Sequence, residues 1–374
     1  MPQPLLVIAA GGTGGHMFPA QALAEEMLAR GWRVKLATDS RGARYAGGFP
    51  AEVERQVTTA ASFAQGGAAA KLAAPFLIGW GALVSLIAMR RDRPVCVAGF
   101  GGYPALPALL AAGALGVPRL IHEQNGVLGR VNRHFAARVN ALACGVWPTD
   151  VPEGARVVHT GNPVREAALA QAEAPYRPPG PGPVSLVVIG GSQGAGMFAR
   201  VVPAAVAQLD PALRARLRIS QQVRPEDMAR VQDAYGELDV AAELRGFFED
   251  APERLAGAAL VISRAGAGSI ADITVIGRPA ILIPYPHATD DHQAANAAGL
   301  VQAGGAFMIR EEELTPEVLA GHVAAILSDP EGASAMAEAS RARGRPDATN
   351  ELAELVERLA AGRARLAAPR EERA

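Results

Sequence analysis

The sequence predicts an α/β protein made of two doubly wound domains, each with a parallel sheet covered by helices on both faces. Short apolar strands alternate with helices along the chain, which is the pattern of such sheets. A glycine-rich turn follows the first strand of each half, at 11–15 and at 190–194. Five prolines and two glycines at 174–183 can form neither a helix nor a central strand, and they interrupt the pattern. The domain boundary is expected near 161–163, which gives domains of 1–162 and 163–346, or else at this proline-rich run.

The predicted elements follow one another in a regular order. In the first domain, apolar runs predict strands at 5–10, 33–37, 95–98, 119–122, 141–145 and 157–160. In the second domain, they predict strands at 184–189, 218–221, 260–263 and 280–284. A periodic apolar pattern predicts a helix at 19–30, directly after the first glycine turn. A tail helix over about 347–364 is also expected, and packing of this helix on the first domain is left open.

Composition excludes several classes of protein. The chain has 374 residues, 49% of them hydrophobic, which is ample for two cores and excludes a mainly disordered protein. Its two cysteines, Cys96 and Cys144, each lie in an apolar run. They exclude a disulfide scaffold and a cysteine-based zinc site, and they fit a reducing compartment.

The formal net charge of −1 hides an uneven distribution. Residues 1–162 carry 15 Lys and Arg against 9 Asp and Glu, a net +6, whereas residues 163–374 carry 21 against 28, a net −7. Two interpretations remain open. The basic first half could meet phosphates or a lipid surface, or the asymmetry could be compositional drift alone.

The start of the chain lacks the basic region and the long apolar stretch of a signal peptide. An uncharged stretch at 72–89, flanked by Lys71 and two arginines, is at the lower limit of a membrane-spanning helix. The strand at 95–98 follows closely and should join the sheet of the first strand, so we expect a helix that stays on one side of a membrane. Its apolar surface is either core or a membrane contact aided by the cations. That surface comprises Leu72, Phe76, Leu77 and Trp80.

The first glycine turn leads to a candidate catalytic residue. Glycines at 11–15 let a ligand approach the backbone, and the helix that follows attracts phosphate to its N-terminus. A dinucleotide fingerprint would need glycine in place of Met17, so a dehydrogenase is disfavoured. His16 opens the helix, where the N-terminus favours a neutral imidazole that can accept a proton. The alternatives are a turn that only packs helix on strand and a structural histidine.

The turn at 190–194 repeats this arrangement in the second half. Two such turns would direct two helix N-termini into one interdomain cleft, which suits a ligand with a diphosphate. The chain has no D-x-D motif and no G-x-x-x-x-G-K-[ST] loop. A metal ion on the diphosphate is therefore not indicated, and helix dipoles with arginines would stabilise a leaving anion. The histidines and aspartates at 287–293 match no familiar zinc spacing.

Two further polar segments are candidates for binding. Residues 122–125, His-Glu-Gln-Asn, follow a strand, and we expect this run to lie outside the core and to form hydrogen bonds in the cleft. A local turn is the alternative. The segment 264–269, with Asp272 one turn into the next helix, is typical of a nucleotide pocket. Its small residues allow close approach, and a carboxylate can accept both ribose hydroxyls.

Six segments, taken in order, closely resemble the MurG family of bacterial peptidoglycan synthesis. They are GGTGGHMFPA from Gly11, GFGGYPALP from Gly99, HEQNGVLG from His122, GNPVR from Gly161, GGSQGA from Gly190 and the segment 264–272. The family transfers N-acetylglucosamine from UDP-N-acetylglucosamine to lipid I, the undecaprenyl-diphosphate-linked muramyl pentapeptide, and forms lipid II. The resemblance implies a GT-B fold, with two Rossmann-like domains facing an interdomain cleft. It also implies an inverting transfer that needs neither metal nor cofactor.

The resemblance implies roles for individual residues as well. His16 matches the family's favoured base candidate, and Thr13, Gly14 and Gly15 match a loop that faces the acceptor and the donor phosphates and sugar. Of the other donor contacts, Asn125 matches a sugar contact, and the diphosphate side matches Arg165, Ser192, Ala267, Gly268 and Ser269. Phe248 matches a position whose backbone contacts uracil, Asp272 matches a ribose ligand, and Gln293 matches a glutamine of the donor site. The acceptor side matches Gly101, Gly102, Tyr103 and Glu123.

The chain departs from the family pattern at two places. It has Gly268-Ser269 and then Asp272 where the family often has Leu-Thr and then Glu, so a shorter carboxylate must reach the ribose directly or through water. It has His292-Gln293 where some relatives have paired glutamines. Both departures concern the detail of the donor pocket.

The family docks its first domain on the cytoplasmic face of the inner membrane. The resemblance therefore implies a peripheral membrane protein with no nucleic-acid partner, in agreement with the basic first half and the apolar surface described above. Three competing interpretations remain. They are another GT-B enzyme that transfers a sugar from a UDP-sugar to a lipid, a UDP-sugar epimerase, and a nucleotide-binding module without turnover.

Overall fold

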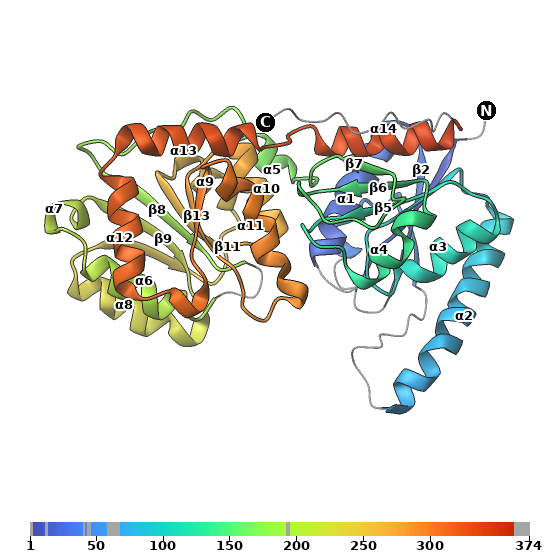
Figure 1. Ribbon diagram of the computed structural model, residues 1–374, viewed down its shortest axis with the longest axis horizontal. Coiled ribbons are helices and arrows are strands. Elements are labelled where there is room, and N and C mark those ends of the chain that lie inside the picture. The colour runs from blue at the N-terminus through green and yellow to red at the C-terminus, as the bar shows by residue number, and fades with distance from the viewer. Residues whose placement is uncertain are drawn as a thin grey trace. The chain divides into compact units, whose positions relative to one another are not determined.

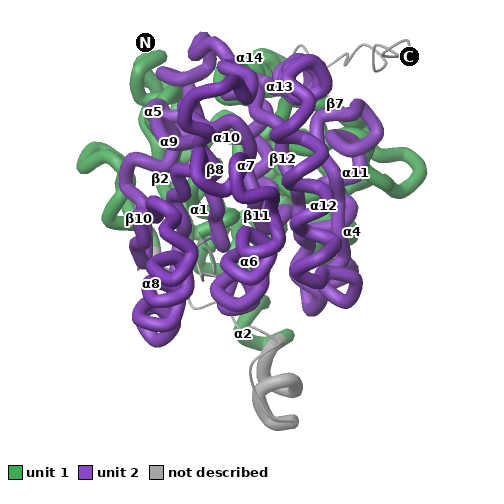
Figure 2. Tube along the Cα trace, turned by 90° about the vertical axis from the view of Figure 1, so that its left-hand side faces the viewer, with its two compact units in different colours: residues 1–164, 347–374 green, residues 165–346 purple. Residues whose placement is uncertain are grey.

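The computed structural model describes residues 3–11, 14–39, 42, 46–57, 68–191 and 195–362, apart from the side chains of 57 and 68–74. The chain forms two compact units (Figure 2). The first comprises Met1–Val164 and Asp347–Ala374, and the second is Arg165–Pro346. Each unit contains one parallel sheet with helices on both faces, which confirms the predicted fold class.

The first unit is built on a seven-stranded sheet in the order β3-β2-β1-β4-β5-β6-β7. Its strands are β1 (Leu5–Ala9), β2 (Arg33–Thr38), β3 (Glu54–Val57), β4 (Cys96–Gly99), β5 (Arg119–Glu123), β6 (Ala141–Cys144) and β7 (Val157–His159). Every neighbouring pair is parallel. The sequence predicts all of them except β3. That strand reads Glu-Arg-Gln-Val and lies at the sheet edge, so it has no apolar run to reveal it.

Helices cover both faces of the first sheet (Figure 1). They are α1 (Gly14–Ala29), α2 (Ala68–Arg91), α3 (Ala105–Ala114), α4 (Arg130–Phe135) and α14 (Ala348–Ala360). The strands alternate their side chains between the two faces. Leu6 and Ile8 of β1 pack in one core with α1 and α14, while Val7 and Ala9 pack in another with α3 and α4.

The last helix within the described residues, α14, belongs to the first unit. Leu352, Leu355 and Val356 of α14 are fully buried in the core that also contains α1. An ion pair of 3.0 Å between Arg30, the residue after α1, and Glu357 of α14 lies at the edge of this contact. The apolar stripe of α14 therefore completes one face of the first sheet.

The second unit contains a six-stranded parallel sheet in the order β10-β9-β8-β11-β12-β13. Its strands are β8 (Val184–Ile189), β9 (Leu217–Gln222), β10 (Ala241–Arg245), β11 (Leu260–Arg264), β12 (Ala280–Ile283) and β13 (Ala306–Met308). The sequence predicts the four inner strands. It misses β10 and β13, the two edge strands, because one is polar and the other has only three residues.

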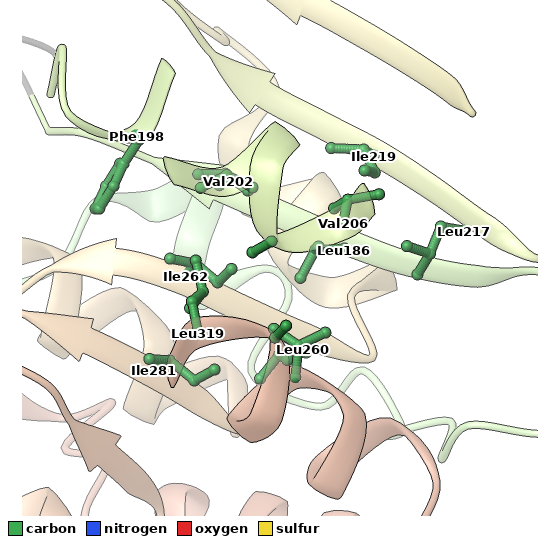
Figure 3. Close-up of a cluster of buried hydrophobic side chains, with 14 of the residues drawn as sticks. Leu186, Phe198, Val202, Val206, Leu217, Ile219, Leu260, Ile262, Ile281 and Leu319 are labelled. Carbon is green, nitrogen blue, oxygen red and sulfur yellow. The ribbon is translucent and has the colours of Figure 1, made fainter. Parts of the chain in front are cut away.

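Helices also cover both faces of the second sheet. They are α5 (Glu166–Leu169), α6 (Phe198–Ala207), α7 (Pro211–Arg214), α8 (Met228–Glu237), α9 (Ala251–Gly257), α10 (Ala267–Ile276), α11 (His292–Gln302), α12 (Pro316–Leu327) and α13 (Pro330–Ala342). Phe198 and Val202 of α6 pack with Leu319 of α12 against Leu186 and Ile262 of the sheet (Figure 3). The opposite face holds α9, α10 and α11.

The strand order places the glycine-rich loops at special positions. In the first sheet the order reverses between β1 and β4, which are followed by loops that begin at Ala10 and Phe100. In the second sheet it reverses between β8 and β11, which are followed by loops that begin at Gly190 and Ala265. Ligands of open parallel sheets bind beyond the carboxyl ends of strands at such reversals. Each unit therefore presents one pair of candidate ligand loops.

Candidate active site

In the first unit, the loops after β1 and β4 pack against each other so closely that only glycine fits. A Cβ atom on Gly11 would lie 2.7 Å from Cγ of Pro104. Gly101 has a left-handed backbone (φ +87°), and a Cβ atom there would lie 3.2 Å from both His16 Nε2 and Asn132 Nδ2. The glycines thus bring the backbone of one loop against the imidazole that begins the helix after the other.

His16 lies in the first turn of α1, with its Nδ1 atom 3.2 Å from the carbonyl oxygen of Gly11. Because a carbonyl only accepts, Nδ1 carries the proton, and in the neutral ring Nε2 carries the lone pair. Burial lowers the pKa of His16 below 6.5, although the charge of Glu123 and the Gly11 carbonyl act in the opposite direction. The arrangement is chemically suited to a general base that acts through Nε2.

Glu123 is a buried hydrogen-bond centre beside this histidine. Its carboxylate is 2% exposed and accepts from the backbone N–H and side-chain amide of Asn125, at 3.0 and 3.2 Å. It also accepts from the backbone of Gly129 and the amide of Asn132, both at 2.9 Å. Glu123 therefore shapes the loop that carries Asn125 and fixes Asn132 against Gly101.

The expectation that residues 122–125 lie outside the core is wrong for the first three of them. His122, Glu123 and Gln124 are buried, because β5 is an inner strand and continues through Glu123. Burial lowers the pKa of His122 to about 4, so this ring is neutral at physiological pH. Its Nε2 atom donates to the carbonyl of Gly161, at 3.2 Å. Within this run, only Asn125 is partly exposed.

In the second unit, Gln222 connects two loops at the carboxyl edge of the sheet. Its side-chain oxygen accepts from the backbone of Gly190, at 3.0 Å, and its amide donates to the carbonyls of Gly191 and Gly246, at 3.1 and 3.0 Å. The loop after β8 and the loop after β10 are thus tied together. Phe248, in the latter loop, is buried, and the guanidinium of Arg254 lies 4.3 Å from the centre of its ring.

Asp272 and Arg165 form an ion pair in the second unit. The carboxylate lies on α10, one turn beyond its first residues, and is 3.6 Å from the guanidinium of Arg165, the residue that precedes α5. Burial raises the pKa of Asp272 to about 6, although Arg165 lowers it. A half-buried carboxylate with an exposed arginine beside it offers an acceptor for hydroxyl groups and a cation for phosphate.

Other predicted donor contacts lie at the same edge of the second sheet. Ala267, Gly268 and Ser269 form the first turn of α10, which starts directly after the loop that follows β11. Gln293 lies in the first turn of α11, and its side-chain oxygen accepts from the backbone N–H of Tyr285, at 2.9 Å. The short segment before α11 has a left-handed backbone at both Asp290 and Asp291, a strained geometry of the kind often found at binding sites.

Three predicted positions lie outside the described residues, namely Thr13, Ser192 and the side chain of Leu72. Two residues at the candidate loops, Asn132 and Gln222, are absent from the sequence prediction. Asn132 has a recognisable signal, since it interrupts the buried face of α4 formed with Val131 and Phe135. Gln222 is the last residue of an inner strand, where a polar side chain faces the loops.

The surface of α2 provides a separate feature of the first unit. Gly81, Ser85 and Met89 are buried on the side of α2 that packs on α3. An opposite stripe is exposed and apolar: Phe76 (81%), Trp80 (63%), Leu83 (45%) and Ile87 (43%). Leu77 is also partly exposed, and Arg90 and Arg91 end the helix. In Figure 1, α2 extends away from the sheet of its own unit.

The core interpretation of this surface is therefore wrong for Phe76 and Trp80 within the first unit. Leu83 and Ile87 extend the stripe beyond the residues that the sequence analysis selects. Among the described residues, no helix has both the length and the apolar character that crossing a membrane requires.

Comparisons with known proteins place this geometry in a class. The glycosyltransferase family 28 N-terminal domain matches residues 6–144, and the corresponding C-terminal domain matches residues 185–359. The crystal structure of Acinetobacter baumannii MurG is similar over 96% of this chain and 100% of that chain, with a TM-score of 0.79 and 29% identity. The calicheamicin glycosyltransferase CalG4 shares the fold, with a TM-score of 0.67 and 16% identity over 98% and 100% of the two chains. The fold is that of the GT-B glycosyltransferases.

Two relatives named UDP-N-acetylglucosamine--N-acetylmuramyl-(pentapeptide) pyrophosphoryl-undecaprenol N-acetylglucosamine transferase are similar over nearly the whole chain. The protein of Rhizobium leguminosarum bv. trifolii (strain WSM2304) is 50% identical over 367 residues, 97% of each chain. That of Chelativorans sp. (strain BNC1) is 49% identical over 359 residues, 96% of each chain. The chain belongs to glycosyltransferase family 28 and, within it, to the MurG family.

Proposed function

We propose that this protein transfers N-acetylglucosamine from UDP-N-acetylglucosamine to the muramyl 4-hydroxyl of lipid I and so forms lipid II. The substrates follow from the names of its relatives and from its family. The observation that carries the chemistry is His16, a histidine held neutral by burial, with Nδ1 bound to Gly11 and with its ring at the strand-order reversal of the first sheet.

In the proposed reaction, His16 Nε2 takes the proton of the 4-hydroxyl as its oxygen attacks the anomeric carbon of the donor. The bond from that carbon to the diphosphate oxygen breaks, UDP leaves, and the configuration at the anomeric carbon inverts. Gly14 and Gly15 place the N-terminus of α1 beside this chemistry. Gly101, Gly102, Tyr103 and Glu123 are the proposed acceptor-side residues, and Asn125, on the loop that Glu123 shapes, is the proposed donor-sugar contact.

The donor nucleotide is proposed to bind the second unit. Asp272 would accept the ribose hydroxyls, and Arg165 with the N-terminal turn of α10 would neutralise the diphosphate. The backbone near Phe248 would contact uracil, since that side chain is buried in its own unit. Gln293, whose oxygen already binds the backbone of Tyr285, keeps its amide for the donor sugar. Thr13 and Ser192 remain proposals from the family resemblance.

A direct assay tests this function. Radiolabelled N-acetylglucosamine should pass from the UDP-sugar to lipid I, and UDP-glucose and UDP-N-acetylgalactosamine should be poorer donors. UDP binding without transfer would favour a nucleotide-binding module. Interconversion of UDP-sugars without any acceptor would favour an epimerase, and transfer to a different lipid would favour another GT-B enzyme.

The nucleotide affinity is expected to fall at acidic pH. The pKa of Asp272 is about 6 without ligand, and ribose hydroxyls that donate to it favour the ionised form. The contribution of Asp272 is thus present above pH 6 and lost as the pH falls through 6. We expect the Kd for UDP to rise roughly tenfold between pH 7 and pH 5, in addition to the titration of UDP itself. Calorimetry at several pH values measures this change.

The matched control is Asp272→Asn, which keeps the shape of the side chain and removes its titration. Its pH dependence should reduce to that of the UDP phosphates. An identical pH dependence in the two proteins would contradict the role of Asp272.

Transfer is also expected to continue in a chelator. The chain has no D-x-D motif, and in the proposed site Arg165 with the N-terminus of α10 would neutralise the leaving diphosphate. The initial rate with EDTA should stay within about twofold of the rate with Mg²⁺. Loss of transfer in EDTA that Mg²⁺ restores would show that these residues do not suffice.

We further propose that the protein acts as a peripheral protein on the cytoplasmic face of the inner membrane. The exposed apolar stripe of α2, with Arg90 and Arg91 at its end, supports a contact with an anionic lipid surface. The relatives are named for an undecaprenol-linked acceptor, and contact with the membrane would bring the protein to such a lipid.

A further inference from the structure

Residues 165–176, the first segment of the second unit, form hydrogen bonds along their whole length. Arg165 precedes α5, whose residue Ala168 is fully buried. Successive turns continue to Ala174, since the N–H groups of Gln171, Ala172 and Ala174 each bond to a carbonyl three residues earlier. The Tyr176 hydroxyl then donates to the carbonyl of Ala259, at 2.8 Å. Residues 165–176 therefore form one bonded segment that begins with the proposed diphosphate ligand.

Arg278 joins this segment to the ends of two helices. Its side chain is fully buried. The guanidinium donates to carbonyl groups at the C-terminal ends of α9 and α10 and in the segment: Leu255 (3.1 Å), Ala256, Ile276 (2.8 Å), Gly277 (2.9 Å), Ala174 (3.4 Å) and Pro175 (3.3 Å). The planar guanidinium has five N–H donors for these six carbonyls, so some N–H groups are shared between acceptors, for example Nε between Leu255 and Ala256. The negative ends of two helix dipoles favour its charge.

Arg341 of α13 binds the same carbonyls from another side. It donates to Ala174 at 2.8 Å, to Ile276 at 3.0 Å and to Ala172. Its side chain also packs on Gly277, where an added Cβ atom would lie 2.8 Å from Arg341 Cβ. The two arginines thus share the carbonyls of Ala174 and Ile276.

These contacts fix both partners of the Asp272–Arg165 ion pair. Asp272 lies on α10, and the carbonyls at the end of that helix are bound by both arginines. Arg165 begins the segment whose carbonyls the same arginines bind. In addition, α5 packs on both α9 and α10. A shift of the segment would move Arg165, which is otherwise half exposed, away from the carboxylate 3.6 Å from it.

We propose that Arg278 and Arg341 are positioning residues for nucleotide binding. Among the described residues, neither arginine forms a hydrogen bond with the candidate ligand loops. They hold residues 165–176 against α10, and so they keep Arg165 placed to bind the diphosphate beside Asp272. This inference rests on the proposed donor-binding function of the second unit and assigns that site two residues that do not touch the ligand.

The test uses UDP as the probe and the full chain, with calorimetry to measure Kd. Arg341→Ala is the principal variant, because this side chain is only half-buried. We expect it to raise the Kd for UDP about fivefold, the scale of coupling through packed elements. Arg341→Lys keeps the charge but has fewer donors in a different geometry. Its Kd for UDP should lie between those of the unmodified protein and Arg341→Ala.

Arg216→Ala is the matched control. Arg216 also donates to carbonyls of the proline-rich run, those of Gly180 and Gly182, but at the far end from Arg165. This variant should change stability without changing the Kd. An equal weakening by Arg216→Ala would contradict the inference, because it would show a general loss of stability rather than positioning.

A double-mutant cycle distinguishes positioning from direct effects. If Arg341 acts through Arg165, then Arg341→Ala should have almost no further effect on Kd in the Arg165→Ala background. Additive effects, or an unchanged Kd in Arg341→Ala, would overturn the proposal. Absence of UDP binding by the unmodified chain would instead contradict the proposed donor site itself. Amide exchange at 168–174 supplies a second measurement, since protection there should fall in both Arg341 variants.

Discussion

Replacing His16 with alanine is expected to lower the rate of sugar transfer by roughly 100-fold or more while UDP binding stays nearly unchanged. The proton of the acceptor hydroxyl then lacks the imidazole that is proposed to accept it. His16 belongs to the first unit, whereas the proposed nucleotide contacts belong mainly to the second. A comparison of kcat for lipid I with the Kd for UDP measures the separation of these effects.

His16→Asn sharpens this test. An asparagine amide can still donate to the carbonyl of Gly11, as Nδ1 does now, but it cannot accept the proton. It should therefore preserve the fold of the loop and lose as much activity as alanine. His134→Ala, which removes an exposed histidine of α4, should leave the rate unchanged. Near-normal transfer by His16→Asn would show that another group takes the proton.

The environment of His16 also sets the acidic limb of the pH profile. A general base must be deprotonated, and burial lowers the pKa of His16 below its ordinary value. The kcat of transfer, which requires unprotonated His16, should therefore stay constant as the pH falls to 6.5 and decline only at lower pH. A decline centred above pH 6.5 would point to a different group.

The second large effect concerns the α2 stripe. Phe76→Glu combined with Trp80→Glu is expected to weaken partitioning onto anionic vesicles by roughly 100-fold. Each aromatic side chain that enters the lipid interface contributes about 1.5 kcal/mol or more to the free energy of binding. The two free energies add, so their effects on the partition coefficient multiply. Both residues are more than half exposed, so the substitutions should leave the core of the first unit intact. Vesicle sedimentation measures the partition coefficient.

Two controls accompany this measurement. Phe307→Glu removes an exposed aromatic residue of the second unit and should leave partitioning unchanged. A short soluble analogue of the acceptor should still be glycosylated by the doubly substituted protein, because its chemistry does not need the membrane. Equal partitioning of the doubly substituted and unmodified proteins would remove α2 from membrane contact.

The sequence predicts the inner strands of both sheets well and the edge strands poorly. Strands such as β1 and β11 are buried on both faces, so their apolar runs are unmistakable. The edge strands β3 and β10 contain charged residues, and their pairing with a neighbour, which no local pattern encodes, defines them. The glycine turns could be predicted because a strand, a glycine loop and a helix are contiguous in sequence.

The site shows the same limit. Asp272 follows from its distance to a glycine-containing turn, but its pair with Arg165 joins residues more than 100 positions apart. The carboxylate of Glu123 looks from sequence like a cleft residue, yet the structure surrounds it with four internal donors. Contacts of this kind depend on how distant segments pack, which a single sequence does not reveal.

The position of α14 has a consequence for biosynthesis. The first unit needs Leu352, Leu355 and Val356 to close one of its cores, so the part of the protein that emerges first from the ribosome is the last to finish folding. The second unit has its entire sequence by Pro346 and can mature while its predecessor still exposes an uncovered apolar face. Termination before Leu352 would thus damage the N-terminal half as well as the end of the chain.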